Sequence, residues 1–138
     1  MRLPSVWAVL GGLMVACLVS EVMSAQSSAG GNPEAATVRN PVPVTPESIE
    51  AGRQVYQRNC RACHLSTGKG GSIVREGGPP SADLTDDQWD HGSSDGEIYY
   101  TIESGVPPDF NMEPWEGRIA DTDVWNVINY IRTFTQKK

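Results

Sequence analysis

Five consecutive residues, Cys60-Arg61-Ala62-Cys63-His64, carry the clearest chemistry in this chain. Two thiols three residues apart on one helical turn face the same side, so both can bond to one edge of a porphyrin. The imidazole of His64 then lies beneath the macrocycle and can bind the iron. The spacing therefore predicts one covalently attached haem, haem c, with Cys60 and Cys63 as its attachment points and His64 as an iron ligand.

A disulfide and a zinc site are the other uses of these residues. A disulfide between Cys60 and Cys63 gives His64 no role. A zinc site would recruit His91 as a fourth donor, but the adjacent Cys63 and His64 cannot easily point at one tetrahedral centre, and the usual second ligand pair is missing. Haem attachment accounts for all three residues of the motif.

The second axial position of the iron decides what the site can do, and methionine, histidine and an open position are the options. Met112 lies within the polar, proline-containing loop between the third and last helices, and once residues 1–25 are removed no other methionine remains. A thioether on such a loop is well placed to cover the opposite face of the haem, so Met112 is the favoured ligand. His91 is the competing ligand, and an open site is the third option.

Three main helices and one short helix must position these residues. Thr45 and Pro46 give a capped helix start, and this first helix runs to Cys60. Capping patterns predict a short helix over 85–92 and a main helix over 94–105. The last helix begins near Asp121, and its apolar stripe is formed by Val124, Val127, Ile128 and Ile131.

The remaining segments lack any helical or alternating period. Residues 65–80 are rich in Gly, and residues 106–118 contain three Pro, so both are predicted loops. The fold class is therefore all-α, with the helices and long loops wrapped around the haem. Bound haem supplies apolar surface that so short a domain lacks by itself.

The N-terminal part resembles an export signal. Residues 1–25 have a basic start, an apolar run and small residues at the end, which indicates a signal peptide or, if retained, a membrane anchor. Cys17 lies in a loose lipoprotein-type cleavage sequence, and lipidation there is a further alternative. Residues 26–44 are rich in Ser, Gly, Pro and Ala and are predicted to be a flexible linker, which leaves 45–138 as the folded domain.

Charge is unevenly distributed along the chain. The formal net charge is −6; residues 83–123 hold twelve acids and one base, whereas residues 53–75 hold five bases and no acid. This pattern predicts a polarised surface that would orient transient encounters with redox partners. The acidity argues against nucleic-acid binding.

Residues 45–138 as a whole resemble the class I c-type cytochromes. The likeness rests on Gly52 and Tyr56 before Cys60, on the Cys60-Arg61-Ala62-Cys63-His64 motif, on Met112, and on the last-helix positions Trp125, Val127 and Tyr130-Ile131-Arg132. In that family the glycine lets the first and last helices cross closely. The resemblance implies a small cytochrome c-like fold with His64 and Met112 as the axial ligands of the haem iron.

The resemblance also implies a proline carbonyl that holds the other nitrogen of the axial histidine, and Pro80 is the favoured candidate over Pro79. One departure concerns the residue after the axial methionine. The family usually has Pro there, whereas this chain has Glu113, and a carboxylate close to the haem is expected to lower the reduction potential.

These observations predict a carrier of single electrons rather than an enzyme, acting alone or as the haem subunit of an exported redox complex. Its expected partners are redox proteins such as a dehydrogenase, an oxidase or a respiratory complex. The expected location is the periplasm or the outer face of the cytoplasmic membrane, with a membrane tether if residues 1–25 are kept. A gas sensor or peroxide enzyme would require displacement of Met112, and a colourless interaction domain would require that no haem is bound.

Overall fold

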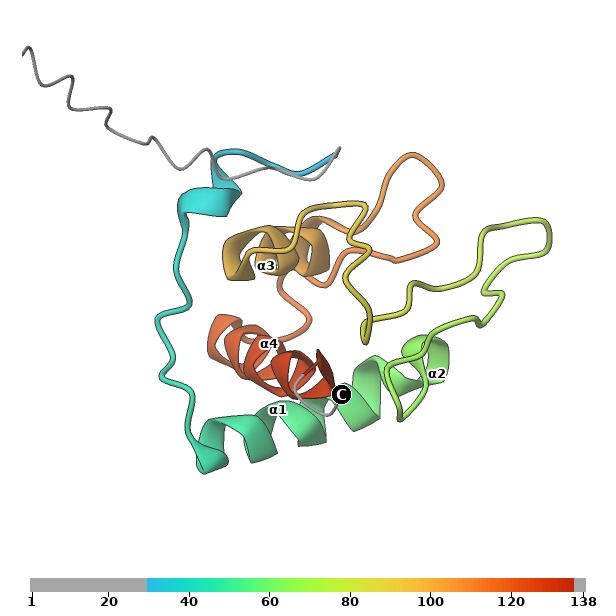
Figure 1. Cartoon of the computed structure of the whole chain (residues 1–138). Helices are drawn as coiled ribbons and strands as arrows, with labels where there is room; N and C mark the ends of the chain where they lie inside the picture. The colour runs from blue at the N-terminus through green and yellow to red at the C-terminus, as the bar shows by residue number, and fades with distance from the viewer. Residues whose placement is uncertain (1–29, 136–138) are drawn as a thin grey trace, which may run out of the picture.

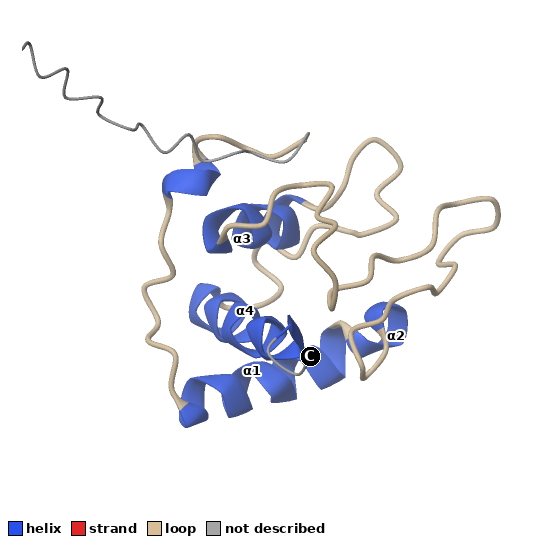
Figure 2. Cartoon of the chain, viewed as in Figure 1, coloured by secondary structure: helices blue, strands red, loops and turns tan. Residues whose placement is uncertain are grey.

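A computed structural model describes residues 30–135 of the chain, and over this range the protein is helical (Figures 1 and 2). A 3-10 turn, η1 (Ala35–Thr37), is followed by α1 (Pro46–Asn59), α2 (Arg61–His64), α3 (Asp95–Ser104) and α4 (Asp121–Thr135). Within the described residues no strand forms, and Ile73 and Pro80 make one isolated bridge. The prediction of a small all-α fold is confirmed.

The helix starts follow from local capping chemistry. The Thr45 side chain accepts the Ser48 N–H at 3.2 Å, and the Ser48 hydroxyl accepts the Thr45 N–H at 3.0 Å. Ser94 and Glu97 form the same reciprocal pair at the start of α3. Gly105 ends α3 with φ of +69°, a conformation that favours glycine. The predicted starts of α1 and α3 are therefore found in the structure.

The predicted short helix over 85–92 is wrong, because the segment is a series of bends and turns. The Asp83 carboxylate accepts both the backbone N–H and the hydroxyl of Thr85, each at 2.7 Å. The Asp86 carboxylate accepts the Gln88 N–H at 2.9 Å. These short-range bonds offer the backbone an alternative to helical hydrogen bonding. Among the α-helices of residues 30–135, the short one is α2, which follows α1 directly.

The core lies where α1 crosses α4, and α3 lies on the other side of α4 (Figure 1). Gly52 sits at the crossing, where a Cβ atom would collide with the backbone carbonyl of Asn126. Tyr56, fully buried, packs edge-on against Tyr130 and Phe134, with ring centroids 5.3 and 5.5 Å apart. The close crossing therefore depends on the absence of a side chain at position 52.

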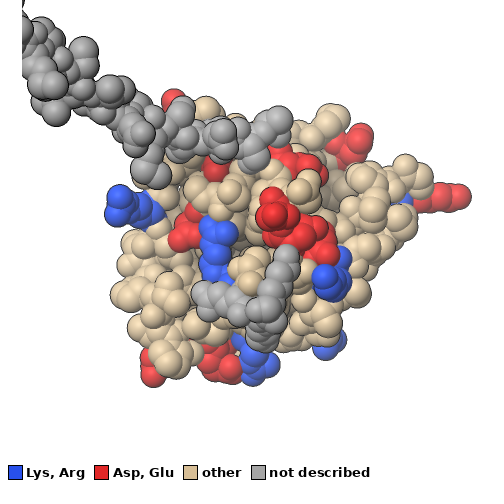
Figure 3. Space-filling view, in the orientation of Figure 1, with Lys and Arg blue, Asp and Glu red and all other residues tan. Residues whose placement is uncertain are grey.

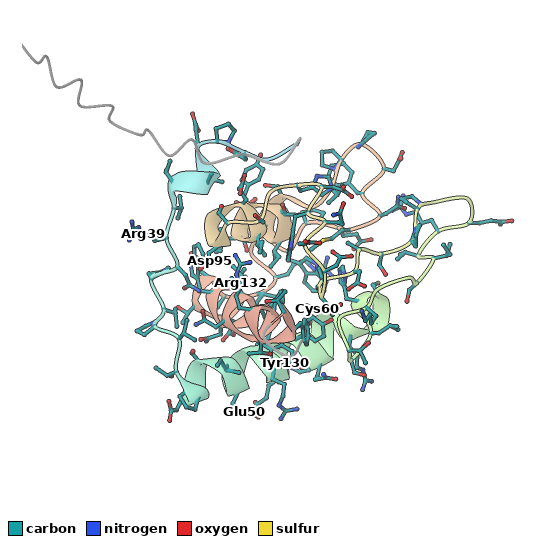
Figure 4. All side chains as sticks on the ribbon, in the orientation of Figure 1. Arg39, Glu50, Cys60, Asp95, Tyr130 and Arg132 are labelled. Carbon is teal, nitrogen blue, oxygen red and sulfur yellow. The ribbon has the colours of Figure 1, made fainter. Side chains whose placement is uncertain are left out.

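An ion pair joins α4 to the start of α3. The Arg132 guanidinium donates to the Asp95 carboxylate at 2.6 and 2.9 Å and to the Ser93 carbonyl at 2.6 Å. Figure 4 shows Arg132 and Asp95 lying beside each other between the two helices. These bonds hold the segment before α3 against the end of α4.

Residues 30–44, which we call the N-terminal strap, differ from the predicted flexible linker. The Asn40 amide donates to the Trp125 carbonyl at 3.1 Å and to the Asn129 side chain at 2.9 Å. Asn129, 1% exposed, donates in turn to the Val42 carbonyl at 3.3 Å and to the Ser48 hydroxyl at 3.1 Å. The strap runs past α3 and α4 before it enters α1 (Figure 1).

The predicted signal or anchor over 1–25, with Cys17, lies outside the described residues. Within 30–135, no helix combines the length and the apolarity that crossing a bilayer requires.

Candidate haem site

The two cysteines of the motif lie at the junction of α1 and α2. The Cys60 carbonyl accepts the N–H groups of Cys63 at 3.2 Å and His64 at 2.9 Å, so the motif forms one tight helical turn. Figure 4 shows Cys60 where α1 meets the long loops. Both thiols are free, and burial raises the pKa of Cys60 to about 12. The structure thus presents two separate thiols on one turn, as thioether attachment needs.

One cavity of about 350 Å³ collects the predicted site residues. Its volume falls within the range of small-molecule and cofactor pockets, about 300–1,000 Å³. Its walls come from α1 and α2, from the loops on either side of α3, and from α4. The side chains that make its lining mostly apolar are Val74, Leu84, Trp89, Ile98, Ile102, Phe110, Trp115, Val127 and Ile131.

His64 borders this cavity with one ring nitrogen already bonded. Its Nδ1 lies 3.1 Å from the Ala82 carbonyl oxygen, an acceptor that assigns the proton to Nδ1 and leaves Nε2 free to bind a metal. Burial lowers the pKa of His64, and the bond to Ala82 opposes that shift. Burial thus favours the neutral form of the imidazole, which is the form that binds iron.

The predicted role of Pro80 is wrong, because the carbonyl beside His64 belongs to Ala82. Pro80 is exposed and pairs with Ile73 at the isolated bridge. The Ser81 hydroxyl donates to the Cys63 carbonyl at 2.7 Å and thereby brings the chain alongside the haem motif at residues 81 and 82. The path of the loop, rather than the identity of the proline, decides which carbonyl reaches the histidine.

Gly70 makes this approach possible. Its φ is +63°, and a Cβ atom there would collide with the carbonyl oxygens of Ser81 and Ala82. The Gly70 N–H donates to the His64 carbonyl at 3.1 Å. The Gly-rich composition predicted a loop that wraps closely around a ligand, and here it lets the chain return beside the axial histidine.

Met112 reaches the same cavity from the loop between α3 and α4. The Val106 N–H donates to the Met112 carbonyl at 2.9 Å, and the Phe110 N–H donates to the Val106 carbonyl at 3.0 Å. These bonds close the chain into a compact loop whose end presents Met112, half-buried, to the cavity. Glu113 beside it pairs with Arg118 at 3.3 Å, and both side chains are mostly exposed.

His91, the competing ligand, also borders the cavity, but its side chain is exposed. Arg75, Ala82 and Phe110 are site residues that sequence reasoning did not single out. The apolar Phe110, two residues before Met112, was a usable signal. Neither Arg75 nor Ala82 carries a local pattern that distinguishes it from the rest of its loop.

These residues fit a haem. Two thiols, a neutral imidazole and a thioether surround one apolar cavity, and these are the groups that attach and ligate haem in proteins. No cluster of three or more His, Cys, Asp or Glu side chains suited to a metal ion occurs in residues 30–135. The zinc alternative therefore finds no second set of ligands in this part of the chain.

Comparison with known families agrees with this geometry. The family model described as cytochrome c oxidase, cbb3-type, subunit III matches residues 47–131. The chain belongs to this family. It is a class I c-type cytochrome whose cofactor is covalently bound haem c and whose function is one-electron transfer.

Curated relatives show the same domain in two settings. The cytochrome is 34% identical over 83 residues to the cbb3-type cytochrome c oxidase subunit FixP of Bradyrhizobium sp. (strain ORS 278), covering 60% of this chain but 26% of that protein. It is 33% identical to subunit FixPc of Rhizobium leguminosarum bv. viciae, covering 66% of this chain and 29% of that subunit. Cytochrome c6 of Euglena gracilis is 28% identical, with 59% of this chain and 87% of that protein covered.

Proposed function

We propose that the iron of this cytochrome is held between His64 and Met112 and that both axial positions stay filled during electron transfer. The observation that carries the proposal is that Cys60, Cys63, His64 and Met112 border one apolar cavity. The bond from His64 to the Ala82 carbonyl supports it further, because that bond leaves Nε2 free for the iron.

The two side chains have different roles in this proposal. His64 is the fixed ligand, because its ring is anchored to a backbone carbonyl. Met112 is the softer ligand, and a thioether raises the reduction potential of a haem relative to a second histidine. The haem itself supplies the iron that cycles between its ferric and ferrous states. With both positions filled no substrate reaches the iron, so we propose a carrier and not an enzyme.

The partner we propose is a respiratory complex outside the cytoplasm. Two relatives are named as subunits of cbb3-type cytochrome c oxidase, and each is much longer than the matched region. Export is supported by the predicted signal over 1–25 and by the chemistry of haem attachment, which takes place outside the cytoplasm. We therefore propose a location in the periplasm or on the outer face of the membrane, with residues 1–25 as the tether if they are kept.

Optical spectra of the haem-loaded protein test the axial ligands. The ferric protein should show the weak long-wavelength charge-transfer band of iron–methionine ligation, and Met112→Ala should remove it while haem attachment stays complete. His91→Ala is the matched control and should leave the band unchanged. A low-spin spectrum without the band that changes only in His91→Ala would contradict the proposal and assign the ligand to His91. A high-spin spectrum of the unmodified protein would instead favour an open site.

A further inference from the structure

The loop that presents Met112 is shaped by its own bonds but joined to the rest of the cavity at few points. Residues 106–112, which we call the methionine loop, are closed by the two bonds that Val106 makes with Met112 and Phe110. Both bonds lie within the loop. They fix its shape, but they do not tie its tip to the facing wall of the cavity.

The facing wall is the loop over residues 72–81, and Arg75 reaches across from it. The Arg75 Nη1 donates to the Asp109 carbonyl oxygen at 2.9 Å, which joins two segments 34 residues apart. Arg75 and Met112 both border the haem cavity. The acceptor is a backbone carbonyl, so the contact is a hydrogen bond and does not need a carboxylate partner.

A second contact lies beside the first. A Cβ atom placed on Gly78 would lie 3.1 Å from Oδ1 of Asn111, so the Asn111 side chain packs directly on the backbone of the facing loop. Asp109 and Asn111 flank Phe110, and Met112 follows immediately. The two loops therefore meet just before the methionine.

We propose that Arg75 is a positioning residue that clasps the methionine loop to the facing loop and limits how often Met112 leaves the iron. This inference rests on the proposed ligation by Met112 and adds the residue that retains the ligand. A loop that opens and closes admits an added ligand only in proportion to the time it is open. The strength of the clasp should therefore set the apparent affinity for a competing ligand.

Imidazole added to the ferric haem-loaded protein at mildly alkaline pH measures this opening, because it is neutral there and insensitive to a change of local charge. Loss of the iron–methionine band shows that imidazole has bound to the iron in place of Met112. Losing one hydrogen bond of ordinary strength should raise the open fraction about fivefold. Arg75→Met, which keeps the length of the side chain, should therefore bind imidazole about fivefold more tightly. Arg75→Lys keeps the charge but not the planar group, so its affinity for imidazole should lie between those of the unmodified protein and Arg75→Met.

Two more variants separate the clasp from charge and from folding. Arg58→Met removes an exposed arginine from the last turn of α1 and should bind imidazole like the unmodified protein. Gly78→Val pushes Asn111 off the facing loop without changing charge, and it should tighten imidazole binding as Arg75→Met does. Haem content and far-ultraviolet circular dichroism confirm that each variant is assembled.

The outcomes are decisive. Affinities for Arg75→Met and Gly78→Val equal to that of the unmodified protein would overturn the clasp. So would an effect of Arg75→Met that high salt abolishes, because a screened effect is one of charge. If the unmodified ferric protein lacks the iron–methionine band, methionine ligation itself fails, which is a different result from unchanged imidazole affinity in a protein that shows the band.

Discussion

Tyr56 links the helix crossing to the haem motif through one atom. Its ring is fully buried between α1 and α4, and its hydroxyl donates to the Leu65 carbonyl at 2.8 Å. Leu65 directly follows His64 and has a positive φ of 61°. Burial raises the pKa of Tyr56, so the hydroxyl remains a donor across the neutral range. The bond fixes the point at which the chain leaves the axial histidine.

Replacing Tyr56 with Phe should lower the free energy of unfolding by about 1 kcal/mol, because the Leu65 carbonyl loses its shorter hydrogen bond and keeps only the Gly68 N–H at 3.3 Å, while the packing of the ring is kept. Urea unfolding of the haem-loaded protein, followed by circular dichroism, measures the change. Tyr100→Phe is the matched control, because Tyr100 is 49% exposed. Equal effects of the two substitutions would show that the Tyr56 bond contributes nothing specific.

For single residues, the sequence predicts the arrangement of side chains that lie within one short motif. Cys60, Cys63 and His64 act through their spacing, so their positions on one turn follow from the motif. The partner of His64 depends on the path of the intervening loop. Pro80 and Ala82 are two residues apart, and the bond from Ser81 to Cys63 together with the close approach at Gly70 decides which of their carbonyls reaches the imidazole.

Among the elements, the crossing of α1 and α4 makes the sharpest demand on one residue. Gly52→Ala should lower the free energy of unfolding by about 1–3 kcal/mol, because the added methyl group forces α1 away from the Asn126 carbonyl. Glycine is otherwise a poor helix former, and alanine alone would stabilise α1 by up to about 1 kcal/mol. The predicted sign is therefore opposite to the helix preference.

Thermal unfolding of the haem-loaded protein tests the crossing. Gln54→Ala, on the exposed side of the same helix, is the control and should change the melting temperature little. A Gly52→Ala protein that melts at or above the temperature of the unmodified protein would contradict the close-crossing account.

Helix starts were predictable where a capping residue and an apolar stripe agree, as for α1 and α3. The segment 85–92 shows the limit of that reasoning. Thr85 and Gln88 suit a capping box, but the Thr85 hydroxyl donates to Asp83 and the Gln88 N–H donates to the Asp86 side chain instead. No apolar stripe follows that would reward helix formation by burial.

The strap widens the folded unit of the whole molecule beyond the boundary expected at Thr45. Its composition lacks a hydrophobic period, so nothing local predicts that it packs. The bonds that hold it to the core join it to Trp125 and Asn129, far away in α4, and no sequence pattern in residues 30–44 predicts those partners. The match of the family model, which begins at residue 47, does not include the strap either.

Asn40→Ala in the full chain should remove three hydrogen bonds, to the Trp125 carbonyl, the Asn129 side chain and the Val42 N–H, and leave Asn129 with fewer partners. We expect a loss of about 1–2 kcal/mol in the free energy of unfolding and faster amide exchange in the strap. Hydrogen exchange followed by mass spectrometry measures both effects. Arg39→Ala changes the exposed neighbouring residue and is the control. Unchanged exchange in Asn40→Ala would show that the Asn40 side chain does not hold the strap.

Acidic side chains gather over the centre and upper part of the face in Figure 3, and basic ones lie singly around them. Lys69 pairs with Asp83 at 3.5 Å, which neutralises part of the basic stretch predicted from the sequence. A polarised surface remains a prediction. The salt dependence of electron-transfer rates with a basic and an acidic partner protein measures it.

The aromatic lining of the cavity has an optical consequence. Trp89 and Trp115 border the site, and Trp125 is stacked on Tyr99 within the core, with ring centroids 4.1 Å apart. Haem absorbs at the wavelengths where indole emits. In the native protein it should therefore quench the fluorescence of these nearby rings by resonance energy transfer. Tryptophan emission should therefore be weak when the chain is folded and strong when it is unfolded. Its intensity would report the distance between the indole rings and the haem without an added dye.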